Sequence, residues 1–498
     1  MTHTSINSNQ NKLSRRDLAI LAGVVILIAA IYLITSKVTY GIGFPLDDSW
    51  IHQTYARNLA MRGEWAFRPG IPSAGSTAPL WSALLAIGFL LGLSPYIWTY
   101  FLGALVLFSL AVVCDWAVRQ LVERYHPQFP WVGIFIALEW HLVWAAMSGM
   151  ETLFHGLIVT TVLIMLMTNT NRYLSLGLLT GFAVWVRPDG LTLIGPVFMT
   201  ILFTQQNIRL RLSALARYMI GLGSLFVPYL LFNLALGGTP MPNTFYAKQA
   251  EYASWQMMPI ITRLGQMALQ LLVGPGLVLI PGVVYWLVKA SQKKIWGSLA
   301  ALMWCAGYLG LYISRLPVYQ HGRYIMPAMP IFFLFGLLAF AEVDNSKIFA
   351  RYQWTIQTIW RASSIMFTLA FIFLGARAYA QDVAIIESEM VVTAKWVEAN
   401  LPANALVAAH DIGALGFFDN HRLIDLAGLV SPDVIPFIRD EPRLANYLNR
   451  LNVDYLIAFP NFYPLLTSNA QTVFVTNSAV TLTFGQKNMV VYLWKTPE

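Results

Sequence analysis

Apolar runs separated by short polar segments fill the first 380 residues of the chain. A helix needs roughly 20 apolar residues to cross a bilayer at about 1.5 Å rise per residue. The runs that approach this length lie at 18–34, 79–93, 96–118, 131–147, 152–168, 173–187, 191–204, 216–236, 273–289, 295–314, 324–342 and 360–380. This pattern predicts a polytopic α-helical membrane protein with about 11–13 transmembrane helices.

The run at 79–93 is short for a span, and Ser94-Pro95 separates it from the next run. The loop before it and the basic residues after position 118 are expected on opposite faces of the membrane. The segment 79–118 must then cross an odd number of times. Either the run at 79–93 dips into the membrane and returns, or another of the runs does not cross.

Polar character returns after Gln381, and the apolar runs shrink to the length of strands. Four such runs lie at 405–409, 455–459, 473–475 and 489–494, and helical periods appear near 391–399 and 441–448. We therefore divide the chain into a disordered cytoplasmic N-terminus at 1–14, a transmembrane module at 15–380 and an extracytoplasmic α/β domain at 381–498. A domain of this length can bury a modest core of its own.

Composition supports the membrane interpretation. Hydrophobic residues make up 57% of the chain and charged residues 11%, against about 25% charged residues in soluble domains. The net charge of +8 comes from small basic clusters between apolar runs, which is typical of cytoplasmic loops rather than of a nucleic-acid surface. By the positive-inside rule, these clusters predict that the N-terminus lies on the cytoplasmic side of the plasma membrane and the loop at 36–79 on its outer side. Both cysteines lie within apolar runs, so a disulfide framework is not expected.

The loop at 36–79 carries Asp47 and Asp48 just beyond the first apolar run. Two neighbouring carboxylates at a membrane exit can act as a catalytic base, or as ligands of a divalent cation such as Mg²⁺ or Mn²⁺. They can equally be a helix cap and a solvated loop acid. The sequence leaves both the role and the metal open.

A helix is expected from Trp50 to Arg62, capped by Asp48 or Ser49 and ended by Gly63. Its residue spacing predicts an amphipathic helix that lies along the outer membrane interface. The candidate substrate contacts on this helix are His52, Tyr55 and Arg57.

Further acids and cations gather on loops that the predicted topology places outside. Glu151 begins a helix, where the dipole favours an acid, and it can also face the Asp pair across a cavity as a catalytic residue. Cations on outer loops oppose the positive-inside bias and suggest an anionic partner, although each can also be an interfacial side chain. The candidate substrate-binding residues of these loops are Arg187, Asp189, Asn243, Tyr246, Lys248, His321, Arg323 and Tyr324.

Some polar residues have a structural interpretation. His410-Asp411 and Asp425 lie in the C-terminal domain without a nucleophile motif, which favours turn chemistry over a hydrolase site. Asp115 and Glu139 lie inside apolar runs, where a charge costs about 2.5–3.5 kcal/mol on insertion scales. Such intramembrane acids would suit a transporter.

The set of outer acids and cations matches the parts of a polyprenyl-phosphate sugar. Arg and Lys can hold the phosphate as charge builds on it, and a carboxylate can take the proton of an acceptor hydroxyl. A nearby carboxylate also stabilises an oxocarbenium-like transition state. No nucleotide is needed, in agreement with the lack of a phosphate-cradling Gly-rich loop.

The chain resembles the GT-C class of polyprenyl-phosphate-dependent glycosyltransferases, and within it the branch of the mycobacterial terminal arabinofuranosyltransferase. Single motifs are weak, but their ordered set covers most of the chain. The motifs are Asp47-Asp48 with Tyr55–Leu59, Gly75–Trp81, Gly149–Thr152, Arg187–Gly190, Pro242–Lys248, Arg323-Tyr324, Asp411–Ala414 and Ile424–Leu429.

The resemblance implies an inverting transfer with an Asp of the first outer loop as base, here Asp47 or Asp48, with Asp47 favoured by analogy. Ser49-Trp50 and His52 depart from the expected pattern, so the sugar is not fixed as arabinose. The leading hypothesis is transfer of a sugar from a polyprenyl phosphate to an extracytoplasmic glycan, lipid or protein. The alternatives are a transporter or flippase of lipid-linked sugars, and a scaffold subunit without catalysis.

Overall fold

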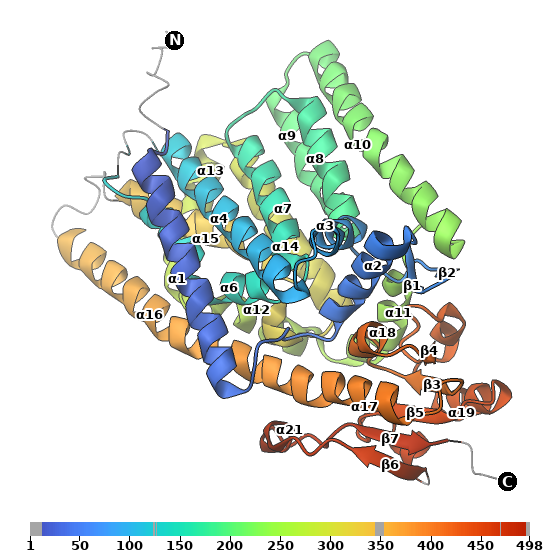
Figure 1. Ribbon diagram of the computed structural model, residues 1–498. Helices are drawn as coiled ribbons and strands as arrows, with labels where there is room; N and C mark the ends of the chain where they lie inside the picture. Colours follow the sequence, from blue (N-terminus) through green and yellow to red (C-terminus); the bar gives the residue numbers. More distant parts are fainter. Residues whose placement is uncertain (1–11, 123–124, 126, 344–352, 469, 495–498) are drawn as a thin grey trace.

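The computed structural model describes residues 12–122, 125, 127–343, 353–468 and 470–494 (Figure 1). The N-terminus that we expect to be disordered, residues 1–14, lies almost wholly outside these residues. The basic residues Arg124, Lys347 and Arg351 of the predicted cytoplasmic clusters also lie outside them.

The first part of the chain is a helical bundle with one short β-hairpin, β1 (Ala66–Arg68) and β2 (Ile71–Pro72). Its helices are α1 (Arg15–Thr39), α2 (Asp48–Arg62), α3 (Pro79–Leu90), α4 (Pro95–Leu121), α5 (Trp131–Leu138), α6 (Trp140–Met147), α7 (Thr152–Met167), α8 (Tyr173–Val186), α9 (Ile194–Thr204), α10 (Ile208–Gly237), α11 (Asn243–Glu251), α12 (Ile260–Leu272), α13 (Gly276–Lys293), α14 (Trp296–Arg315), α15 (Met329–Val343) and α16 (Gln353–Ile386). Short 3₁₀ turns are η1 (Pro188–Leu193), η2 (Ala253–Met257), η3 (Gln320–Gly322) and η4 (Met326–Ala328).

Six helical segments of the described residues are long and apolar enough to cross a membrane, or seven if the bent pair α12 and α13 forms one span. The predicted total of about 11–13 exceeds this count. Four of the other apolar runs form shorter helices, at Pro79–Leu90, Thr152–Met167, Tyr173–Val186 and Pro188–Thr204. The run at 131–147 is broken into α5 and α6 at Glu139.

Helix α3 is the structure of the run at 79–93, for which the sequence left open whether it crosses the membrane. It has 12 residues, so it is about 18 Å long and cannot cross a hydrocarbon core of about 30 Å. It packs against α2, and the chain turns back through Gly92, which has a positive φ of 68°, into α4. Only α4 in this segment is long and apolar enough to cross, which agrees with the expected odd number of crossings.

The C-terminal part is the expected α/β domain. Its elements after the bundle are the π turn η5 (Glu387–Val391), α17 (Val392–Asn400), β3 (Leu406–Ala409), α18 (Gly413–Phe418), β4 (Arg422–Asp425), the 3₁₀ turn η6 (Pro432–Phe437), α19 (Glu441–Arg450), β5 (Tyr455–Ala458), α20 (Pro464–Thr467), β6 (Gln471–Val475), α21 (Ala479–Thr483) and β7 (Val490–Leu493). The four predicted strands are present, and β4, a run of only four residues with an exposed Arg422, is the one that the sequence analysis missed.

The five strands form one mixed sheet in the order β4-β3-β5-β7-β6. Strands β4 and β5 pair in parallel with β3, whereas β7 pairs antiparallel with both β5 and β6. In the central register, Ala408 of β3 lies opposite Ile424 on one side and Leu456 on the other. Loops that leave the carboxyl ends of β3, β4 and β5 therefore meet at one edge of the sheet.

The start of α1 and the C-terminal domain lie at opposite ends of the bundle (Figure 1). Helix α16 continues through η5 into α17 and carries the chain from the bundle into the domain. On the domain side, α18 packs directly against α2. The first loop and the C-terminal domain thus form one contiguous structure.

Helix α2 begins and ends close to the predicted positions, but the prediction of an interfacial helix is wrong. All residues from Ser49 to Ala56 are buried, because α3, α18 and β1 cover the helix. The predicted cap is also wrong. Asp47 occupies the N-cap position with φ −63° and ψ −38°, outside the extended region that side-chain capping needs, and its side chain makes no cap hydrogen bond.

The helix with the expected interfacial character is α12. It meets α13 at an angle of 100°, at Val273 and Gly274, so the two helices lie nearly perpendicular to each other. Met267 and Leu271, near its C-terminal end, are buried, whereas Ile260, Ile261 and Leu264, near its N-terminal end, are exposed. An exposed apolar stripe on an in-plane helix is typical of contact with the membrane interface.

We expect a spin label at Ile261→Cys to be more accessible to oxygen than to a water-soluble nickel chelate in phosphatidylcholine vesicles. Ile261 is 71% exposed, and the matched control Leu482→Cys, at a site 58% exposed in the C-terminal domain, should show the reverse. The native Cys114 and Cys305 are buried. Equal accessibility of the two labels to the chelate would contradict the assignment.

Candidate active site

A cavity of about 500 Å³ opens between the first loop, the bundle and the C-terminal domain. Its bundle side is lined by Pro45, Asp47, Asp48, Ile51, Lys248, Glu251, Tyr252, Tyr319, Gln320, Arg323, Tyr324, Asp382, Ile385, Ile386 and Met390. Its domain side is lined by His410, Asp411, Ile412, Ala427, Leu429, Arg439, Phe459, Phe462, Thr481 and Gln486. Acids, cations and aromatic rings therefore share one hollow with an apolar wall.

Asp48 and two cations form the electrostatic centre of the cavity. Its Oδ2 accepts a hydrogen bond of 2.6 Å from Nη2 of Arg323 and lies 3.9 Å from Nζ of Lys248. Both cations also lie over the ring of Tyr324, at 5.0 and 5.4 Å from its centroid. Burial alone would raise the pKa of Asp48, but the two cations lower it to about 2, so this carboxylate is ionised at neutral pH.

The guanidinium of Arg323 still has an unused donor. Its Nη2 donates to Asp48 and to the hydroxyl of Tyr324, whereas its Nη1 is buried and has no hydrogen-bond partner among the described residues. A buried donor without a partner costs about 1–3 kcal/mol or more when charged. An anionic oxygen in the cavity would satisfy it, and a phosphate fits the planar fork of an arginine.

Asp47, the neighbour of Asp48, faces the C-terminal domain. Its Oδ2 and Oδ1 accept hydrogen bonds from the backbone N–H groups of Gly413 and Ala414, at 2.6 and 2.8 Å. Burial and the nearby carboxylate of Asp411 raise the pKa of Asp47 to about 7, although the two N–H groups oppose this rise. A carboxyl group that titrates near neutral pH in a cavity is suited to proton transfer.

The C-terminal domain brings further titratable groups that the sequence analysis assigned to turns or missed. His410 lies 3.3 Å from Glu251, and Arg439 donates a hydrogen bond of 2.7 Å to the same carboxylate. Asp411 has a buried Oδ2 that finds no hydrogen-bond partner in the part of the chain that the structure describes. His410 and Asp411, for which the sequence analysis favoured turn chemistry, thus line the cavity. Both residues follow the carboxyl end of β3, where a parallel sheet commonly binds its ligands. Their position directly after a predicted strand could therefore have identified them as site residues from the sequence.

A second polar cluster lies behind the cavity and holds several predicted site residues. Glu151 is fully buried between Nε2 of His52, at 3.3 Å, and Nη1 of Arg187, at 2.8 Å. Arg187 also donates to Asp189 at 3.0 Å. Asp189 in turn accepts hydrogen bonds from Tyr308 and Tyr312. Glu151, expected to face the Asp pair across the cavity, does not line it, because these partners neutralise it within the bundle.

This buried cluster touches the cavity through one aromatic pair. The ring of Tyr312 stacks on that of Tyr324, with 5.8 Å between centroids and 11° between planes. Arg187 donates to the hydroxyl of Tyr312 at 3.3 Å, so the cluster supports the ring that lies under Arg323 and Lys248. Its members thus contact the wall of the cavity rather than its interior.

The remaining predicted residues hold neighbouring elements together. The hydroxyl of Tyr55 bonds to Ser73 at 2.6 Å, and Arg57 donates to the carbonyl of Phe417 on α18. His321 bonds to Asp382, which itself lines the cavity, at 2.8 Å. Asn243 is buried, and Tyr246 packs edge-on against its neighbouring phenylalanine.

Asp47 and Asp48, the predicted ligands of any divalent cation, already have partners in the structure. Both oxygens of Asp47 are bonded to backbone N–H groups, and Asp48 already faces two positive side chains. Among the described residues, the group whose potential ligand atoms lie within 4.8 Å of one another is elsewhere: Glu398, Asp419 and His421. His421 there bonds to both Asp419 and the carbonyl of Pro402, so its two nitrogens are engaged.

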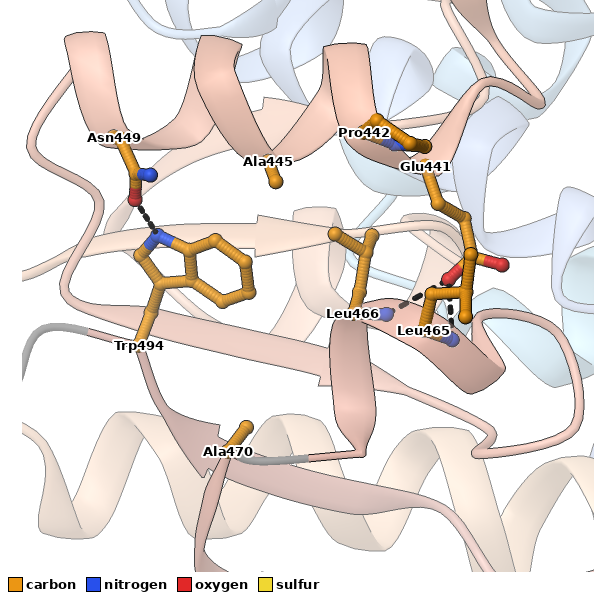
Figure 2. A pocket seen from close by; sticks show the side chains of 8 residues that line it. All are labelled: Glu441, Pro442, Ala445, Asn449, Leu465, Leu466, Ala470 and Trp494. Atoms are coloured by element: carbon orange, nitrogen blue, oxygen red, sulfur yellow. Dashed lines mark hydrogen bonds between the residues drawn. The ribbon is translucent and has the colours of Figure 1, made fainter.

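A smaller hollow of about 330 Å³ lies on the C-terminal domain, between α19 and α20 (Figure 2). Its polar side chains bond to one another or to backbone. Glu441 accepts the N–H groups of Leu465 and Leu466, and Trp494 donates to Asn449 (Figure 2). The larger cavity, with its unpartnered charged atoms, is the better candidate for an active site.

The intramembrane acids have structural partners. Glu139 caps α6 through the N–H of Leu142 and bonds to His141 at 2.8 Å. Asp115 accepts hydrogen bonds from Arg119 at 2.7 Å and from the N–H of Gly133. Because their oxygens are used inside the bundle, these acids give a transport pathway no support.

Solved structures share this fold. ArnT from Cupriavidus metallidurans in the apo state has a TM-score of 0.62 at 15% identity, covering 96% of this chain and 99% of that one. The same protein bound to undecaprenyl phosphate has a TM-score of 0.58 at 15% identity, with the same coverage of both chains.

The archaeal oligosaccharyltransferase AglB from Archaeoglobus fulgidus, in complex with an inhibitory peptide and a dolichol-phosphate, has a TM-score of 0.59 at 11% identity, covering 90% of this chain and 70% of that one. The predicted GT-C-like membrane fold with a C-terminal α/β domain is thereby confirmed. The finer resemblance to the mycobacterial arabinofuranosyltransferase branch stays a prediction.

Sequence comparisons add one result. A family model described as a domain of unknown function (DUF8728) matches residues 378–492, which is most of the C-terminal domain. A search of curated proteins finds no match to the chain.

We expect Gly413→Ala to loosen the contact between the C-terminal domain and the first loop. A Cβ at this position would lie 1.9 Å from the backbone oxygen of Asp47, so backbone must shift, at a cost of about 1–3 kcal/mol. The purified variant should show a lower Tm and faster trypsin cleavage. Gly307→Ala on α14, where a Cβ meets nothing within 4 Å, is the control. An unchanged Tm in both variants would contradict the prediction.

Proposed function

We propose that the protein is an inverting glycosyltransferase that moves a sugar from a polyprenyl-phosphate donor to a hydroxyl of an extracytoplasmic acceptor. One observation carries the proposal. Arg323 and Lys248 meet Asp48 in a cavity that also contains Asp47, and Arg323 keeps a buried Nη1 without a partner. Solved structures of the same fold carry undecaprenyl phosphate or dolichol-phosphate, which is consistent with a lipid phosphate here.

The proposed step uses each group once. Arg323 and Lys248 bind the phosphate and stabilise the charge that develops as the bond between the sugar carbon and the phosphate oxygen breaks. The acceptor oxygen attacks the same carbon from the opposite face and forms the new glycosidic bond. Its proton passes to Asp47, and the polyprenyl phosphate leaves with the electron pair of the broken bond. Attack from the opposite face inverts the configuration.

Asp48 has a supporting role in this proposal. Its ionised carboxylate holds the two cations side by side before the donor binds. With a pKa of about 2, it is a weak base and does not compete with Asp47 for the proton. Asp47 has the pKa of about 7 that proton abstraction at neutral pH requires, and its two oxygens still have unshared lone pairs after the backbone hydrogen bonds.

The proposed side of the membrane follows from charge and arrangement. The basic clusters between the apolar runs favour a cytoplasmic position for the end of the bundle opposite the cavity. The cavity is at the end that carries the C-terminal domain, so donor and acceptor would meet outside the plasma membrane (Figure 1). The transporter alternative loses its main support, because Asp115 and Glu139 are paired inside the bundle.

Removing either carboxylate should abolish most of the transfer. With purified protein, undecaprenyl-phosphate-linked sugars and cell-envelope fractions as acceptor, we expect Asp47→Ala to lower the rate about 10²–10⁴-fold through loss of the base. Asp48→Ala should lower it through misplaced cations, and mass spectrometry measures the product. Asp433→Asn, on the exposed surface of the domain, is the matched control. Full activity of both Ala variants would refute the proposal.

The rate should also report the titration of Asp47. Burial and Asp411 raise its pKa to about 7, and only the ionised form accepts a proton, so kcat/KM should fall tenfold per pH unit below about 7 and level off above it. Asp48, with a pKa of about 2, stays ionised and adds no break in this range. In Asp411→Asn the break should move to lower pH, since a neighbouring negative charge is removed. A flat profile between about pH 5 and 8 would exclude Asp47 as the base.

A further inference from the structure

The carboxyl ends of the three parallel strands of the C-terminal domain all open into the cavity. His410 and Asp411 follow β3, Ala427 follows β4, and Phe459 follows β5, and all four line the cavity. The chain leaves β3 toward β4 on one side and returns past β3 to reach β5 on the other. Such a reversal of strand order creates a crevice at the carboxyl ends, which is where open α/β sheets bind ligands.

At this edge of the sheet, Asp411 has a carboxylate oxygen that can still accept a hydrogen bond. His410 and Arg439, the two cations beside it, are both engaged by Glu251. The Oδ2 of Asp411, by contrast, is buried without a hydrogen-bond partner. A buried acceptor without a donor is destabilising, so a ligand that brings a hydroxyl or amide donor would repay part of that cost.

Two phenylalanines form an apolar surface at the same edge. The ring of Phe459 is 9% exposed and packs 5.5 Å from that of Phe462, which is 43% exposed and lines the cavity. Phe462 also packs edge-on against His410 at 5.8 Å. An exposed aromatic face beside an unpartnered carboxylate matches the two surfaces of a sugar ring, an apolar C–H face and a rim of hydroxyl donors.

We propose that this edge of the C-terminal domain, formed by Asp411, Phe459 and Phe462, is the acceptor-binding half of the cavity and that the acceptor it binds is a carbohydrate. This proposal rests on the proposed function, because only a glycosyltransferase has an acceptor. It gives the domain matched by the family model a role in binding. Donor and acceptor then enter from different parts of the structure: the donor phosphate lies at Arg323 and Lys248 on the bundle, and the acceptor sugar lies on the domain. Asp47, hydrogen-bonded to α18, is located between them.

The smaller hollow in Figure 2 does not compete for this role. Its half-buried aromatic, Trp494, donates its N–H to Asn449, and its carboxylate, Glu441, accepts two backbone N–H groups. It therefore offers no free carboxylate to a sugar hydroxyl, and it is not part of the cavity that holds Asp47.

The full-length protein in detergent is tested on an array of defined bacterial saccharides, and the affinity for the best-bound saccharide is then measured by thermophoresis. We expect Asp411→Asn and Phe462→Ala each to weaken that affinity about tenfold or more, because a hydrogen bond to a charged group is lost in one case and the ring contact in the other. The matched controls are Asp433→Asn and Phe484→Ala, both at exposed positions of the same domain outside the cavity, and they should bind normally.

Affinity for undecaprenyl phosphate, measured on the same samples, reports folding and the donor side, and it should be unchanged in all four variants. If Asp411→Asn loses its affinity for undecaprenyl phosphate, the test rests on Phe462→Ala, which changes an exposed ring. Phe462→Tyr is then expected to bind the saccharide as the wild-type protein does. No saccharide bound by the wild-type protein, or equal binding by both site variants, overturns the inference. Transfer to a peptide or lipid acceptor alone would overturn the inference and leave the proposed function intact. Saccharide binding at this edge without any transfer would contradict the proposed function and leave the binding site intact.

Discussion

The structure depends on the way two adjacent carboxylates are held. Asp47 and Asp48 start the same helix, yet their side chains point to different parts of the molecule. Asp48 joins the bundle through Arg323 and Lys248, and Asp47 joins the C-terminal domain through two backbone N–H groups of α18. Because of this difference, the pKa of Asp48 is about 2 and that of Asp47 is about 7. Two carboxylates that are adjacent in the sequence therefore have different chemistry.

The contact at Asp47 needs a residue without a side chain opposite it. Gly413 allows the backbone of α18 to approach so closely that a Cβ would lie 1.9 Å from the oxygen of Asp47. Arg57 of α2 adds hydrogen bonds to the carbonyls of Gly416 and Phe417 on the other side of α18. On the domain side these contacts use backbone groups of α18, so the side chains of the domain that line the cavity take no part in them.

Charge compensation distinguishes the two polar clusters. In the buried cluster around Arg187, two acids face one guanidinium, two tyrosines and His52, so its charges are largely neutralised inside the bundle. In the cavity, Nη1 of Arg323 and Oδ2 of Asp411 remain buried without partners. Breaking a buried pair costs about 3–5 kcal/mol, so the ion pairs of the first cluster are structural, although Oε2 of Glu151 meets His52 at 3.3 Å without a hydrogen bond. Among the described residues, the second keeps a donor on the bundle and an acceptor on the domain without partners in one hollow, as expected of a site that binds a ligand.

The sequence alone determined the membrane class, the position of most apolar helices, the short run that became α3 and four of the five strands of the C-terminal domain, because these depend on local hydrophobic periodicity and run length. It also selected Asp47, Asp48, Lys248 and Arg323, since charges beside apolar runs stand out. Only the tertiary structure decided which charges meet. Glu151 and Arg187 pair behind the cavity, whereas His410 and Asp411, which looked like turn residues, reach it from a sheet about 360 positions away along the chain. Periodicity carries no information on such pairing, because it is set by how α2 packs under α18 and by where the parallel strands end.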